Sequence, residues 1–120
     1  MDEFQIKKTL RHEGSVEAEI LKEMAEALGN SGERVERALE KLGQISARIQ
    51  EMRRSLAALD DGPERDSSLY LLEKEIEAYN SLRRNAMEQL RWLIIHREAL
   101  GIRNHAHVAE QYRIPPPMRL

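Results

Sequence analysis

The 120-residue sequence contains no cysteine. This excludes disulfides, thiolate catalysis, zinc sites built on cysteine and iron–sulfur clusters. No stretch reaches the roughly 18 consecutive apolar residues of a membrane-spanning helix, and residues 1–8 lack the apolar core of a signal peptide. We therefore expect a cytoplasmic protein that is neither exported by the general route nor associated with a membrane.

Aromatic residues are scarce, at 4% of the chain, and patterns typical of strands and catalytic sites are missing. Leucine, alanine, glutamate and arginine dominate, as they do in helical bundles. No nucleophile elbow, phosphate-binding glycine loop, zinc-protease motif or nucleotide fingerprint occurs. We expect a protein that is not an enzyme and holds no cofactor. Nucleic acid is not an expected partner, because the basic residues are dispersed and no binding motif appears.

Two apolar seams with heptad spacing dominate the middle of the chain. The first seam consists of Val35, Ala38, Leu42, Ile45, Ile49, Met52, Leu56 and Leu59. The second consists of Leu69, Leu72, Ile76, Tyr79, Ala86, Leu90, Leu93 and Leu100. Alternating steps of three and four residues predict helices that pack like a coiled coil. Because Gly62 and Pro63 predict a turn between the seams, we expect a long antiparallel helical hairpin.

A shorter helix is predicted before the hairpin. Gly14-Ser15 offers an N-cap, Gly29 is placed to end the helix, and Asn30 with Glu33 has capping-box spacing for the next one. Residues 1–13 either extend this helix or lie as an arm across a partner. The expected fold class is all-α, as a three-helix bundle or an oligomeric four-helix bundle. We expect one helical domain over 1–112 and an extended, proline-containing tail over 113–120.

Charge is distributed unevenly along the chain. Residues 13–40 hold eight acidic and three basic side chains, whereas residues 83–120 hold seven arginines and three glutamates. This asymmetry favours packing of the acidic first half against the basic end of the last long helix over an external anionic partner.

The length of the hairpin predicts a further packing surface, because two rods cannot bury every apolar face against each other. The expected first helix is too short to cover the hairpin, so self-association is expected, with a dimer favoured. Four consecutive apolar residues, 92–95, wrap more than half of a helix, which favours contact with a partner protein as well as the core. The predicted partner-binding residues are Trp92, Ile94, Ile95, Tyr112, Ile114, Pro115 and Pro116.

Arg83 and Arg97 occupy positions where the second seam calls for apolar residues. A buried guanidinium requires a partner, because an unpaired buried charge costs several kcal/mol. The structural interpretation is that both arginines reach the edge of the seam and pair with acids of the preceding helix. The functional interpretation is a polar layer that fixes helix register or receives an acidic ligand.

The C-terminal residues suggest two further hypotheses. The prolines at 115–117 impose a polyproline II conformation, which is either a frayed end or a preordered recognition element. His105, His107 and Glu110 form the alternative metal set, although two histidines two residues apart share a face only in an extended segment. The simpler interpretation is that these histidines are solvated or cap a helix, so no metal is expected.

Taken together, these patterns predict a non-enzymatic protein–protein interaction module, such as a helical adaptor, an assembly factor or a chaperone-like scaffold. The C-terminal half of the last long helix and the tail are the predicted interaction surface. The alternative is a helical bundle that binds a small ligand or metal near Trp92, His96 and the His105/His107 pair.

Overall fold

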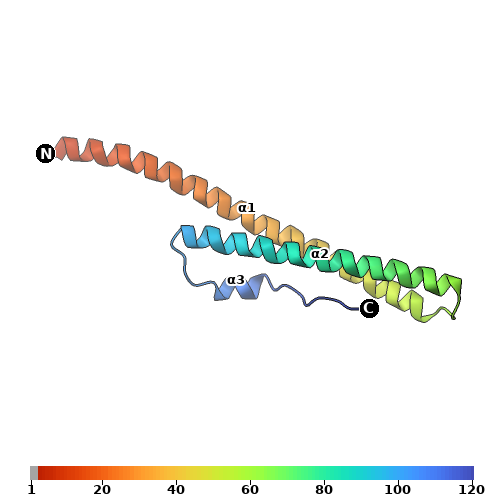
Figure 1. The fold of residues 1–120 in the computed structure, drawn as a ribbon. Coiled ribbons are helices and arrows are strands. Elements are labelled where there is room, and N and C mark those ends of the chain that lie inside the picture. The colour runs from red at the N-terminus through yellow and green to blue at the C-terminus, as the bar shows by residue number, and fades with distance from the viewer. Residues whose placement is uncertain (1–2) are drawn as a thin grey trace.

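The protein is an elongated hairpin of two long helices in a computed structural model that describes the backbone of residues 3–120 and the side chains of residues 15–120 (Figure 1). Helix α1 spans Glu3–Ala57, α2 spans Pro63–Ala99 and the short α3 spans Ala106–Gln111. No strand occurs in the part of the chain whose backbone is described. The molecule measures 89 × 22 × 15 Å, because α1 continues well past the end of α2. The all-α hairpin predicted from the two seams is confirmed.

The separate N-terminal helix was a wrong prediction, because α1 runs without a break through Gly29 and Asn30. A glycine ends a helix readily when it adopts a positive φ, and among residues 15–120 the glycines that do so are Gly62 and Gly101. Inside a helix, glycine costs about 1 kcal/mol relative to alanine, which the surrounding helix-forming residues tolerate. Asn30 and Glu33 therefore lie within α1 instead of capping a new helix. The segment before Gly14 continues the same helix, and its side chains lie outside the described residues.

The turn between the long helices is held by Arg65. Its Nη1 donates hydrogen bonds to the carbonyl oxygens of Leu56 and Leu59, at 2.8 and 3.0 Å. The Leu56 carbonyl belongs to the last turn of α1, where intrahelical donors run out, and the Leu59 carbonyl lies two residues past the end of the helix. Pro63 is the first residue of α2, where a missing N–H costs nothing, and Gly62 supplies the φ of 153° that the turn needs. The predicted turn is confirmed.

Both predicted seams face each other in the hairpin. The most buried members from α1 are Val35, Ala38, Leu42 and Ile49, and those from α2 are Leu72, Ile76, Tyr79, Ala86 and Leu93. They form two clusters, one along the middle of the hairpin and one near its open end. Burial of each large apolar side chain contributes about 1.5 to 3 kcal/mol, so the seams provide the main stabilisation of the fold.

The chain's own C-terminal segment covers one side of the hairpin. Ile114 and Met118 pack against the middle cluster, and Tyr112 packs against the cluster at the open end, to which the buried Val108 of α3 belongs. The further packing surface that the seams predict is therefore provided on this side by residues 106–118, and not by an N-terminal helix.

The expected packing of the acidic first half against the basic end of α2 is largely absent. The antiparallel arrangement brings Ser31 of α1 to His96 near the end of α2, so Glu17, Glu19 and Glu23 lie beyond the hairpin. Among residues 15–120, the ion pair between α1 and α2 is Arg48–Glu75, at 2.8 Å. The order of the acids along α1 places most of them where α2 has already ended.

Candidate interaction surfaces

The C-terminal segment lies in the groove between the two long helices, on the side formed by Glu36 and Arg53 of α1 and by Tyr79 to Arg83 of α2. At one end of the segment, the Tyr112 hydroxyl donates to Oε1 of Glu36 at 3.3 Å, and at the other, Nη2 of Arg53 donates to the Arg119 carbonyl at 2.5 Å. Residues 36–53 of a helix span about 26 Å, and residues 112–119 span about 22 Å in polyproline II geometry. The extended tail therefore runs parallel to α1 and matches this stretch in length.

The hydrogen bonds that hold the tail go to its backbone. Arg83 Nε donates to the Pro115 carbonyl at 2.7 Å, and the Tyr79 hydroxyl donates to the Pro116 carbonyl at 3.1 Å. Asn80 makes two bonds to Met118, donating from Nδ2 to the carbonyl at 3.0 Å and accepting the amide N–H on Oδ1 at 2.9 Å. Proline has no N–H, so the carbonyls of residues 115–117 are their only backbone groups available for hydrogen bonding. Together these contacts form a clamp on the tail.

The arginine partners predicted from the sequence are corrected by these contacts. Arg83 was expected to pair with an acid of α1, yet it donates to the tail. Arg97 donates from Nε to Nδ1 of His105 at 3.2 Å and from Nη2 to the Asn104 carbonyl at 3.1 Å. No ion pair within residues 15–120 involves either arginine. Both guanidinium groups are instead occupied by the C-terminal segment, a long-range contact that heptad analysis does not reveal.

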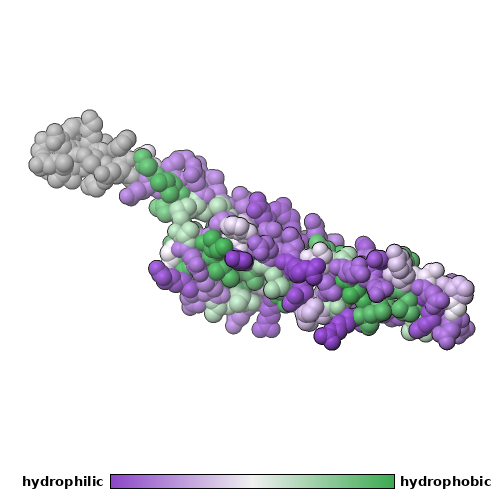
Figure 2. All heavy atoms as spheres, viewed as in Figure 1, coloured by the Kyte–Doolittle hydropathy of each residue, from purple (hydrophilic) through white to green (hydrophobic). Residues whose placement is uncertain are grey.

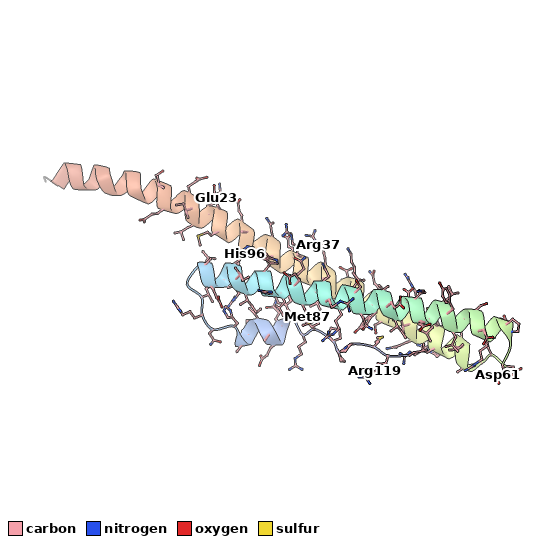
Figure 3. The ribbon with its side chains drawn as sticks, viewed as in Figure 1. Glu23, Arg37, Asp61, Met87, His96 and Arg119 are labelled. Atoms are coloured by element: carbon pink, nitrogen blue, oxygen red, sulfur yellow. The ribbon has the colours of Figure 1, made fainter. Side chains whose placement is uncertain are left out.

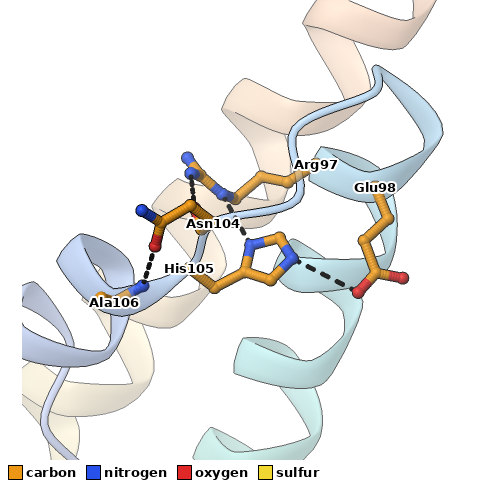
Figure 4. A network of polar contacts seen from close by, with 5 residues as sticks. All are labelled: Arg97, Glu98, Asn104, His105 and Ala106. Carbon is orange, nitrogen blue, oxygen red and sulfur yellow. Dashed lines mark hydrogen bonds and ion pairs between the residues drawn. The ribbon is translucent and has the colours of Figure 1, made fainter.

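His105 belongs to a polar network at the start of α3 (Figure 4). Its Nδ1 accepts from Arg97, so its Nε2 carries the proton and donates to Oε1 of Glu98 at 3.3 Å. Next to it, Oδ1 of Asn104 accepts the backbone N–H of Ala106 at 3.1 Å. This contact lies just before α3, whose N-cap residue is His105 and makes no side-chain capping hydrogen bond.

The alternative metal set of His105, His107 and Glu110 does not come together. Both ring nitrogens of His105 are engaged, while His107 and Glu110 are exposed on α3. Within the part of the chain with described side chains, no group of three histidine, aspartate or glutamate residues is placed to hold a metal ion. Glu98 and His105, seven residues apart across the connection from α2 to α3, share a hydrogen bond and do not form a chelating pair.

His96 joins the open end of the hairpin through a contact that the sequence analysis missed. Its Nδ1 lies 2.5 Å from the Oγ of Ser31, which is the buried polar residue of the core at 2% exposure. The Trp92 ring lies 6.1 Å from the His96 ring, centroid to centroid, and is tilted by 37°. Ser31 occupies the next seam position before Val35, and a serine at a seam position was the available signal for this contact.

The apolar stretch at 92–95 divides as the sequence predicts. Leu93 is 5% exposed and packs in the core, whereas Trp92 and Ile95 remain 47% and 39% exposed. Ile94 is half-buried. Residues three apart share a helix face, so Trp92 and Ile95 form one apolar patch on the outward side of α2. We call this pair the Trp92 surface.

A second exposed apolar region lies on α1 beyond α2. Val16, Ile20 and Leu21 are each about half exposed, at 51%, 50% and 56%. Figure 2 shows hydrophobic atoms gathered on α1 where it leaves the hairpin. These side chains continue the stripe that α2 covers further along the helix.

The predicted binding residues from Tyr112 to Pro116 are engaged within the chain. Ile114 packs on the core, Pro115 and Pro116 accept hydrogen bonds through their carbonyls, and Tyr112 bonds to Glu36. Burial raises the pKa of Tyr112 above its ordinary value of 10.0, and the charge and hydrogen bond of Glu36 raise it further. The neutral phenol is therefore the form that suits this site.

Within the described chain, no helix combines the length and apolar character required to cross a membrane. No protein-family model matches the sequence, and the comparisons with curated proteins and with solved structures find no similar protein.

Proposed function

We propose that this chain is a non-enzymatic protein–protein interaction module that binds another protein through the C-terminal half of α2. The observation that carries the proposal is the Trp92 surface. Large aromatic side chains are enriched at the energetic centres of interfaces, because their burial removes much apolar area from water at a low conformational cost. Trp92 and Ile95 project from a helix whose opposite face is fixed in the core by Leu93, so the surface is rigid before a partner arrives.

The arrangement of the tail supports a scaffold role. The clamp fixes residues 115–119 against the hairpin, so the outward face of α2 belongs to a hairpin with a docked tail and not to a bare pair of helices. A preorganised surface loses less conformational entropy on binding. The alternative function, binding of a small ligand or metal near His96 and His105, has less support, since Ser31, Arg97 and Glu98 already engage these rings.

A site-specific photocrosslink tests the proposal. A photoreactive amino acid replaces Ile95 and, in a control variant, replaces Glu77, an exposed residue five helical turns earlier on the same face. We expect crosslinks to a defined protein in native extract from position 95, and their loss when Trp92→Ala is added. Equal crosslinking at both positions, or none at position 95, would contradict the proposal.

A further inference from the structure

One face of α1 carries charges that are complementary to themselves about Asn30. In chain order, the residues on this face are Glu19, Glu23, Glu26, Asn30, Arg34, Arg37 and Lys41. Each acid has a base at the same distance on the other side of Asn30, at four, seven and eleven residues. Steps of three and four residues keep all seven side chains on one side of a helix, and all seven are exposed.

These charges are available to a partner. Among residues 15–120, none of the three acids and none of the three bases takes part in an ion pair. Figure 3 shows Glu23 and Arg37 on the side of α1 that faces away from the tail, and the tail is marked there by Arg119. The C-terminal segment meets α1 through Glu36 and Arg53 and so leaves this face open.

We propose that two copies of the chain pair in antiparallel orientation through this face, with the two-fold axis at Asn30. Antiparallel pairing places Glu19 opposite Lys41 of the partner subunit, and it places Glu23 opposite Arg37 and Glu26 opposite Arg34 in the same way. The symmetry repeats each pair, so the contact is closed and uses the same surface on both copies. Parallel pairing would set like charges against each other, which is unfavourable.

An apolar contact accompanies the charged one. Arg34, Arg37 and Lys41 line an open groove of about 180 Å³, whose apolar wall is formed by Ala38 and Leu82. Antiparallel pairing about Asn30 sets Ile20 of one copy opposite position 40 of the other, at one end of this groove. Ile20 is 50% exposed in the single chain, so its burial adds a hydrophobic contribution.

Asn30 is suited to the centre of this arrangement. Its side-chain amide both donates and accepts, so two copies related by the axis can bond to each other. A single polar residue within a helical interface is a known means of specifying register. The charge pattern extends over about 33 Å of helix, from residue 19 to residue 41.

The pairing rests on the proposed function, because it assigns a second copy of the chain as the partner of another face, on α1, of the same interaction module. Sedimentation equilibrium of the full chain measures it. We expect reversible association to twice the 13.9 kDa chain mass, weakened by added salt. Glu23→Arg and Arg37→Glu should each weaken association at least tenfold, because each sets like charges together. An equimolar mixture of these two variants should restore the dimer, as should both changes in one chain.

A crosslink tests the register directly. The chain has no cysteine, so Asn30→Cys introduces a single thiol that should form a disulfide-linked dimer under mild oxidation. Ala47→Cys, exposed on the same helix, is the control and should stay monomeric under the same conditions. Circular dichroism of each variant verifies that the exposed substitutions leave the helices intact.

Three results would overturn the pairing. The first is a monomer at every concentration, and the second is a dimer whose stability ignores both charge reversals. The third is failure of the mixed variants to associate. A dimer that Trp92→Ala abolishes while the charge reversals leave it unchanged would refute the α1 pairing and retain the proposed function.

Discussion

The clamp at Asn80 makes a quantitative prediction about how firmly the tail is docked. Asn80→Ala removes both hydrogen bonds to Met118, at 3.0 and 2.9 Å, and leaves the Met118 amide and carbonyl without their protein partner. The substitution lies on the solvent edge of α2, since Asn80 is half-buried, so the two seams of the hairpin should stay intact.

The magnitude follows from the number of bonds lost. A hydrogen bond within a protein contributes about 0.5 to 1.5 kcal/mol net, so two bonds correspond to about 1 to 3 kcal/mol. Since 1.4 kcal/mol is a factor of ten, the population with an undocked tail should rise by about 5- to 150-fold. Ile114 and Met118 keep their apolar contacts with the core in the variant, so undocking should be local.

Amide hydrogen exchange at Met118 is the suitable assay. We expect faster exchange at Met118 in Asn80→Ala and unchanged exchange at Leu42, deep in the core. Ser81→Ala changes the adjacent exposed residue and serves as the control. Unchanged protection of Met118 in Asn80→Ala would refute the role of the clamp.

Other predictions concern the helices, the core and pH. Gly29→Ala should stabilise the fold to urea by about 1 kcal/mol, because a Cβ there meets nothing within 4 Å, whereas Gly101→Ala, at a φ of +85°, should destabilise it by about 1 to 2 kcal/mol. Ile49→Ala, at 0% exposure, should cost about 2 to 5 kcal/mol in the same assay, and a smaller loss would argue against this core. The pKa of Tyr112 is raised in the fold, so its contribution to stability is full below pH 10 and is lost as pH rises through the folded pKa; an ultraviolet titration in which Tyr112→Phe removes no late-titrating phenol would contradict this.

The hairpin was predictable because its periodicity is local information. Seam residues such as Leu42 and Ile76 recur at heptad spacing, and Gly62-Pro63 interrupts them once, so helix, turn and helix follow from short-range rules. Local rules also gave the wrong prediction at Gly29. A glycine after an apolar run resembles a helix stop, but the decision depends on its φ, which the continuing helix sets.

The tail's position was not predictable, because it depends on contacts between residues far apart in the sequence. Arg83 and Pro115 are 32 residues apart, and Tyr112 and Glu36 are 76 apart. In the sequence, Arg83 is only an interruption of the second seam, and Pro115 is only part of a proline-rich end. The one available signal was the presence of Arg83 and Arg97 at apolar seam positions. It indicated that both arginines have hydrogen-bonding partners, but it did not identify those partners. The exposure of Trp92, in contrast, followed from helix geometry, because four consecutive apolar residues cannot share one face.

The fluorescence of Trp92 tests the central claim most directly. It is the only tryptophan in the chain and is 47% exposed, so its emission reports on the proposed contact without any label. Titration with the protein identified by the position 95 crosslink should shift the emission to shorter wavelength, because binding removes the indole from water. A complex that forms with no change in Trp92 emission would contradict the claim that the C-terminal half of α2 is the interaction surface.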